Sequence, residues 1–186
     1  MSTIQAFKVV RTDLSSFADR NFKYRVGRAR LAPKVTGKRT ICYHGLLHCS
    51  LSAPMAAEYG RWPYRLLSVE FDEKDLVDQW SNKYGVLRLF VVDELPTHLC
   101  WGPNGAAVEK IIRRVETLTR EEVEKLNAAR NAARNAAGNA AGNAAGYAAW
   151  DAAGAVAIAD LVGTRGFTQT HFDRLMGPWR RVIGDE

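Results

Sequence analysis

Apolar and polar residues alternate in several short stretches of the first half of the chain, which is the pattern of β-strands with one buried face. The segments predicted as strands from this alternation and from their branched and aromatic residues are 4–11, 22–27, 39–44, 64–71 and 86–92. A short helix is predicted within residues 50–59, because Ser52 suits an N-cap and Pro54 suits the first turn. Residues 1–118 are therefore predicted to form an α+β domain with a small mixed sheet.

A repeat of four residues replaces this pattern between residues 127 and 154. Each tetrad contains an Ala-Ala pair, and most begin with Asn or end with Gly: Asn127, Asn131, Asn135, Asn139 and Asn143, then Gly138, Gly142, Gly146 and Gly154. An α-helix has 3.6 residues per turn, so these rows wind slowly around one helix. Thr119 and Glu122 fit a capping box, and Gly163 is typical of a helix end. One long helix is predicted for residues 119–162, followed by a short C-terminal helical clasp in residues 163–186.

The small side chains of the tetrads suggest a surface for close helix packing. A glycine inside a helix costs about 1 kcal/mol relative to alanine, and close backbone approach offsets that cost. We expect the rows that contain Gly138, Gly142 and Gly146 to associate with a second copy, while Asn131, Asn135 and Asn139 form hydrogen bonds across the seam. In the alternative, the helix packs on its own N-terminal domain or serves as a spacer.

Positive charge is concentrated at the start of the chain. Residues 1–40 contain ten Lys or Arg and two Asp, a local balance of ten minus two, or +8, against +6 for all 186 residues. Such a segment either meets phosphate, in a nucleic acid or a nucleotide, or forms a solvated basic face. No recognised nucleic-acid-binding motif accompanies the charge.

The compartment predicted from the sequence is the cytoplasm. No stretch approaches 18 consecutive strongly apolar residues, and the N-terminus lacks the apolar segment of a signal peptide. The five Asn residues and two Arg residues of the tetrads also argue against a membrane span. Three cysteines form an odd set, which argues against a secreted disulfide scaffold.

Cysteine and histidine residues gather in two short segments: Cys42, His44, His48 and Cys49, then His98 and Cys100. If each segment were a strand, Cys42 and His44 would share one face, and so would His98 and Cys100. Two thiolates and two imidazoles would suit Zn²⁺. The spacing matches no familiar zinc signature and buried cysteines are common, so no metal site is predicted.

The tripeptide Tyr43-His44-Gly45 resembles the strand end of several ADP-ribosyltransferases. That resemblance implies that His44 helps to hold NAD, that Tyr59 stacks on the nicotinamide and that Glu70 supports the transition state.

Residues 47–71 resemble a family of small uncharacterised proteins found in bacteriophages and actinobacteria. Its members share a Phe-His-Ala-Ser-like start, a short helix ending in Tyr and a strand ending in Val-Glu-Leu. The matching residues here are Leu47, His48, Cys49 and Ser50, then Tyr59, and then Val69, Glu70 and Phe71, with Leu and Cys in place of Phe and Ala at 47 and 49. Many members continue into an Ala-rich tetrad helix and a Leu-x-x-Pro-Trp-like close, found here at residues 175–179. The resemblance implies an origin and an architecture.

From these patterns we expect a cytoplasmic accessory or host-interaction protein of phage type, which would work in the host cell if phage-encoded. It would act by binding a host protein, without a cofactor, and would self-associate through the tetrad helix. The alternative is an ADP-ribosyltransferase-like enzyme that uses NAD. A third hypothesis is nucleic-acid binding through residues 1–40.

Overall fold

The computed structural model describes residues 2–41, 45–135, 144–164 and 167–184, and their side chains except at 130–135 and 144–147. The chain divides into two units, Met1–Cys100 and Trp101–Glu186. The boundary predicted from the sequence was residue 118. The difference arises because helix α2 (Gly105–Glu116) packs with the helices that follow it.

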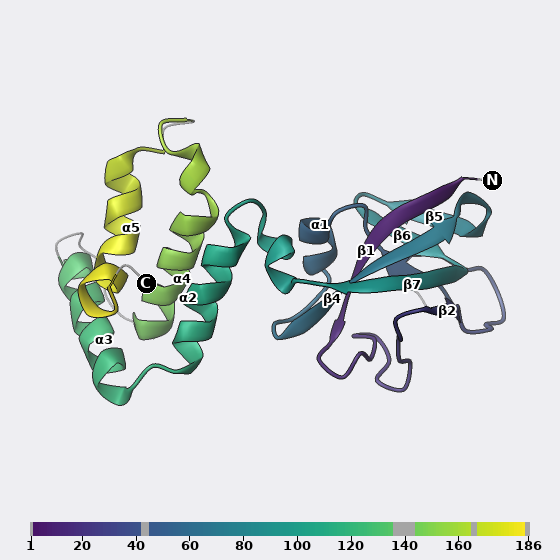
Figure 1. The fold of residues 1–186 in the computed structure, drawn as a ribbon, viewed down its shortest axis with the longest axis horizontal. Coiled ribbons are helices and arrows are strands. Elements are labelled where there is room, and N and C mark those ends of the chain that lie inside the picture. Colours follow the sequence, from purple (N-terminus) through teal and green to yellow (C-terminus); the bar gives the residue numbers. More distant parts are fainter. Residues whose placement is uncertain (1, 42–44, 136–143, 165–166, 185–186) are drawn as a thin grey trace. The chain divides into compact units, whose positions relative to one another are not determined.

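The first unit contains two antiparallel sheets (Figure 1). The first sheet has the order β1 (Thr3–Arg11), β4 (Tyr64–Asp72), β7 (Arg88–Leu95), β2 (Arg28–Leu31). The second has the order β3 (Leu47–Cys49), β6 (Lys83–Val86), β5 (Leu76–Trp80). The α+β class is confirmed, but every strand pairing between described residues is antiparallel, so the predicted small mixed sheet is two antiparallel ones.

The core of this unit consists of apolar side chains from both sheets. Strands β1 and β4 pair in continuous register from Thr3 opposite Asp72 to Arg11 opposite Tyr64. Alternate residues of a strand point to the same face. The buried cluster accordingly takes Ala6 and Val10 from β1; Leu67, Val69 and Phe71 from β4; Leu89 and Val91 from β7; and Leu47, Cys49 and Val86 from the second sheet. Lys8 occupies the position between Ala6 and Val10 on that inward face.

The predicted strand 22–27 does not form, the described part of the predicted strand 39–44 is not a strand, and four strands of the structure were missed. Residues 22–27 contribute a single bridge, Ser15 to Lys23, because the chain turns there and Tyr24 joins the core. Residues 39–41 lie outside any strand, and 42–44 are outside the described residues. Strands β2, β3, β5 and β6 were missed because they have only 4, 3, 5 and 4 residues, too few for an alternation of apolar and polar side chains to stand out.

Helix α1 (Ala53–Ala57) confirms the short helix predicted in residues 50–59. The Ser52 hydroxyl accepts a hydrogen bond from the Met55 amide, as an N-cap does. The chain entering α1 is fastened to β1 by two backbone hydrogen bonds between Phe7 and Ser50, of 2.7 and 2.9 Å. A Cβ at Gly60 would lie 2.8 Å from a methyl group of Val9, so glycine lets the chain after Tyr59 lie against β1.

The second unit is helical, with α2, α3 (Arg120–Asn135), α4 (Ala144–Ala157) and α5 (Gln169–Val182). Short 3₁₀ turns occur at Glu73–Asp75 in the first unit, at Thr97–Trp101 across the boundary and at Ala159–Leu161 in the second unit. Thr119 and Glu122 form the predicted capping box in full: the Glu122 amide donates to the Thr119 hydroxyl and the Thr119 amide donates to the Glu122 carboxylate, at 3.2 and 2.8 Å. Gly163, predicted as a helix end, has a left-handed φ of 88°.

The single long helix predicted for residues 119–162 is not what the structure shows. Leu126 on α3 and Ala148 on α4 belong to the same buried cluster. In one straight helix they would be roughly 33 Å apart, at 1.5 Å per residue. The tetrad segment therefore contributes two helices that pack against each other, with residues 136–143 between them outside the described residues. Among the described residues, the structure has no helix long and apolar enough to cross a bilayer.

Candidate functional site

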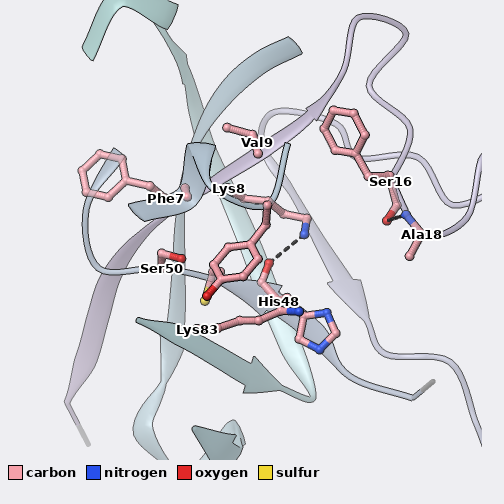
Figure 2. Close-up of a pocket in the computed structure, with 12 residues that line it drawn as sticks. Phe7, Lys8, Val9, Ser16, Ala18, His48, Ser50 and Lys83 are labelled. Carbon is pink, nitrogen blue, oxygen red and sulfur yellow. Dashed lines mark hydrogen bonds between the residues drawn. The ribbon is translucent and has the colours of Figure 1, made fainter. Parts of the chain in front are cut away.

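A cavity of about 120 Å³ opens on the first unit where β1 meets β3, β6 and the chain around α1 (Figure 2). Twelve residues line it: Phe7, Lys8 and Val9; Ser16, Phe17 and Ala18; His48, Cys49 and Ser50; Ala56 and Tyr59; and Lys83. Among these described lining residues are two lysines and a histidine, and none carries a carboxylate. We call this cavity the basic pocket.

Lys8 is the most unusual residue of the basic pocket. It stands on the inward face of β1 and its residue surface is only 9% exposed. The ammonium donates a 2.7 Å hydrogen bond to the His48 carbonyl and lies 4.9 Å from the centre of the Tyr24 ring. Within the described part of the chain no carboxylate forms an ion pair with it. Burial lowers the pKa of Lys8 from 10.5 to about 8, and the nearby Lys83 lowers it as well.

His48 lies on β3, directly opposite Gly85 of β6. Its Nε2 atom is buried and has no hydrogen-bond partner among the described residues. Burial lowers the pKa of His48 to about 3, and the positive charges of Lys83 and Lys8 lower it further in the same direction. The imidazole is therefore neutral at pH 7.

Lys83 and Tyr59 close the other side of the basic pocket. The Lys83 ammonium lies 4.8 Å from the centre of the Tyr59 ring, in cation–π contact. The Tyr59 hydroxyl donates to the Asn82 side chain, which in turn donates a 2.7 Å hydrogen bond to Glu58. These contacts hold the ring of Tyr59, which is 38% exposed, at the pocket mouth.

The thiol of Cys49 does not add a nucleophile to the basic pocket. The residue is buried, and burial raises the pKa of its thiol to about 12. A thiol with such a pKa stays protonated at pH 7, whereas reactive cysteines have a lowered pKa. The chemistry of the pocket is therefore that of cationic and neutral hydrogen-bond donors around a small cavity.

The residues predicted for an ADP-ribosyltransferase site are not brought together among the described residues. Tyr59 lines the basic pocket, whereas Glu70 on β4 lines a different hollow with Thr3 and Arg88. The Glu70 carboxylate accepts a 3.0 Å hydrogen bond from the Gln5 side chain across the β1–β4 pair. His44 lies outside the described residues. The basic pocket thus contains the predicted aromatic residue without the predicted carboxylate.

The predicted self-association residues fall mostly where the structure gives no side chains. Gly138, Asn139 and Gly142 lie outside the described residues, and Asn131, Asn135 and Gly146 lie in helices without described side chains. The alanine pairs of the later tetrads are described: Ala148, Ala149, Ala152 and Ala153 are buried against residues of α2, α3 and α5. This part of the repeat packs within its own chain.

No group of three or more potential metal ligands occurs among the described residues. His98 and Cys100 lie in the 3₁₀ turn Thr97–Trp101 rather than on a strand, so these two residues do not share a strand face. Cys42 and His44 lie outside the described residues. Cys49 and Cys100 are buried free thiols.

Lys8 and Lys83 were not predicted as site residues. The signal for Lys8 was present, because it takes an inward position in the alternation of residues 4–11, where an apolar side chain is expected. No comparable signal marks Lys83, whose place depends on the pairing of β3 with β6.

The comparisons with known proteins add no relationship to this picture. No protein-family model matches the chain, and neither a characterised protein nor a solved structure gives a match.

Proposed function

We propose that this protein works by binding, and that its first unit takes an anionic group, such as a phosphate, in the basic pocket. The observation that carries the proposal is the buried Lys8 ammonium, which faces a small cavity lined without carboxylates. Lys83 and His48 line the same cavity. An anion in this place would meet donors from three strands at once.

Electrostatics favours this function over a purely structural role for Lys8. A buried ammonium is costly unless it is paired, and buried lysines are rarely left without a partner charge. The hydrogen bond to the His48 carbonyl uses one of its three donors. An anion would provide both the missing countercharge and a further acceptor. Charge-assisted hydrogen bonds of this kind are about twice as strong as neutral ones.

The experiment is a calorimetric titration of the full chain with inorganic phosphate and pyrophosphate. Removing one charged hydrogen bond typically costs about 1.5–3 kcal/mol, so Lys8→Met and Lys83→Ala should each weaken binding about 10- to 150-fold. Lys74→Ala is the matched control, because Lys74 is an exposed lysine of the same unit that pairs with Asp72 away from the pocket. It should bind as tightly as the wild type.

Two results would contradict the proposal. One is the absence of saturable binding in the wild type at millimolar anion. The other is equal weakening by Lys74→Ala and Lys83→Ala, since a uniform loss would point to the overall positive charge. Circular dichroism of each variant shows whether the fold is retained, so that a loss of binding can be assigned to the pocket.

For the protein as a whole we propose the role of a cytoplasmic accessory or host-interaction protein of phage type. The residues of 47–71 and 175–179 that resemble the phage family support this role. Self-association through Gly138, Gly142 and Gly146 belongs to the same proposal. Replacing the three glycines by leucine should convert an oligomer into a monomer in light scattering, and an unchanged mass would dismiss self-association.

A further inference from the structure

A larger groove adjoins the basic pocket. It has a volume of about 770 Å³ and is lined by Arg11, Thr12, Asp13, Phe17, Arg20, Tyr59, Arg61, Trp62 and Pro63. Phe17 and Tyr59 line both hollows, so the two adjoin at these aromatic residues. All of these residues belong to the first unit. We call this second hollow the aromatic groove.

The two volumes differ in what they admit. Sites for small organic ligands measure about 300–1,000 Å³, a range that includes the aromatic groove and excludes the basic pocket. The pocket has room for a compact group only, since one water molecule in the liquid takes about 30 Å³. A ligand that used both hollows would place a small anionic end in the pocket and a larger body in the groove.

The charge of the groove is also positive. Its lining contains three arginines, Arg11, Arg20 and Arg61, and one carboxylate, that of Asp13. Asp13 is already engaged, since it accepts a 2.6 Å hydrogen bond from the Ser15 hydroxyl and lies 3.5 Å from the Lys23 ammonium. Hydrogen bonds from Ser15 lower the pKa of Asp13 to about 2, so the carboxylate keeps its charge for these partners.

Three aromatic rings line the groove beside these arginines. The Arg11 guanidinium lies 5.1 Å from the centre of the Phe17 ring, and Trp62 packs edge-on against Tyr64 with ring centres 5.5 Å apart. The Tyr59 ring stands at the junction with the pocket, in contact with Lys83. Bases stack readily on aromatic rings and on guanidinium planes, and this stacking tolerates any base.

We infer that the ligand of this surface is a nucleotide. Its terminal phosphate would lie in the basic pocket beside Lys8 and Lys83, and its base would stack in the aromatic groove against Tyr59 or Trp62. The arginines of the groove would contact the remaining phosphate or the sugar. This inference rests on the proposed anion binding and adds to it the chemical class of the ligand.

The test compares three probes by calorimetry on the full chain: ADP, pyrophosphate and adenosine. ADP should bind at least about tenfold more tightly than pyrophosphate, and adenosine more weakly than ADP. Base stacking on an aromatic side chain is worth enough that Trp62→Leu, which alters the groove and not the pocket, should weaken ADP binding roughly 5- to 150-fold and leave pyrophosphate binding unchanged. Arg61→Ala should weaken ADP binding as well.

Matched controls lie in the same unit outside both hollows. Trp80 is 61% exposed on β5, and Arg25 is an exposed arginine. Trp80→Leu and Arg25→Ala should bind ADP as the wild type does. Equal losses in the controls and in the groove variants would overturn the inference, because they would show a nonspecific effect of surface charge or aromatic content.

The outcomes separate this inference from the proposal beneath it. If pyrophosphate binds and ADP binds no more tightly, the anion pocket stands and the nucleotide is wrong. If neither binds, both fail. If a single-stranded hexanucleotide binds more than about tenfold tighter than ADP and loses affinity with the same variants, the mononucleotide is overturned in favour of a nucleic-acid strand.

Discussion

Replacing Lys8 by methionine tests the free-energy cost of burying the charged ammonium. Burial lowers the pKa of Lys8 from 10.5 to about 8, a shift of 10.5 minus 8, or 2.5. At about 1.36 kcal/mol per unit, holding the charged form in the fold costs about 3 kcal/mol at pH 7. Methionine has a similar length without the charge. Its introduction removes that cost but leaves the His48 carbonyl without its donor, which costs about 1–3 kcal/mol.

The pH dependence separates these two effects. Because the pKa of Lys8 is lower in the fold, the unfolded chain binds more protons between pH 8 and 10.5, and the stability of the wild type rises with pH across that window. Below pH 8 the cost is fully present, and above 10.5 it is gone. The methionine side chain of the variant cannot titrate. The cost of the lost hydrogen bond is nearly independent of pH. It therefore changes the stability difference between the two proteins by a constant amount and leaves the slope of that difference against pH unchanged.

The expected result is a stability difference that changes with pH. Relative to the wild type, Lys8→Met should be about equal to or up to about 2 kcal/mol more stable at pH 7. Between pH 7 and pH 10, the free energy of unfolding of the wild type should rise by about 2.5 kcal/mol relative to that of Lys8→Met. The charged and titratable groups around Lys8, namely Tyr24, His48, Cys49 and Lys83, are present in both proteins.

The assay is urea unfolding of both full-length proteins at pH 7, 8.5 and 10, followed by circular dichroism. A difference that stays constant with pH within about 0.5 kcal/mol would refute the lowered pKa. A variant less stable by more than about 3 kcal/mol at pH 7 would show that Lys8 supports the fold and is not strained within it.

Two further predictions concern His48 and the packing of α4. Since the pKa of His48 is lowered from 6.5 to about 3, the unfolded chain takes up the proton first, and stability should fall as the pH drops from 6.5 to 3. In urea unfolding, His48→Gln should reduce this loss of stability at acid pH. An unchanged dependence on pH would contradict the buried environment assigned to His48. Ala152 is fully buried and Trp150 is 73% exposed on the same helix. Ala152→Leu should cost about 1–3 kcal/mol by overpacking, whereas Trp150→Ala should stay within about 0.5 kcal/mol of the wild type, and the reverse order would mean that α4 presents its other face to the unit.

The strands with clear alternation were predictable from the sequence. Residues 4–11, 64–71 and 86–92 correspond to β1, β4 and β7, in which branched side chains face the core. The short helix after Ser52 was predictable as well, because its cap is local. Strands of three to five residues carry too few side chains for a period to emerge, and for that reason β2, β3, β5 and β6 were missed.

The tetrad segment shows the limit of periodicity as evidence. A four-residue repeat indicates a helix, but it does not say where the helix stops, because alanine and asparagine rows continue unchanged through residues 136–143. Tertiary contacts determine that the segment forms two packed helices, α3 and α4. One example is the buried cluster that contains Leu126, Ala148 and Trp179. Helical stability in proteins depends mainly on such packing rather than on propensity.

The candidate site was predictable in part. Tyr59 was singled out by its resemblance, and it does line the basic pocket. Glu70 was assigned to the same site although it lines another hollow, because sequence gives a residue's strand but not the face it shares with distant segments. Lys8 and Lys83 lie far apart in the sequence, and only the pairing of the strands brings them to one cavity.

The measurement that tests the central claim most directly is the imidazole ¹H–¹⁵N spectrum of His48 during a titration with pyrophosphate. An anion in the basic pocket would offset the positive charges of Lys8 and Lys83, so the His48 signals should shift saturably and the pKa of His48 should rise from its lowered value. The same titration of Lys83→Ala should require a much higher anion concentration. His48 signals that stay in place while pyrophosphate binds, or that move equally in both proteins, would contradict binding at this pocket.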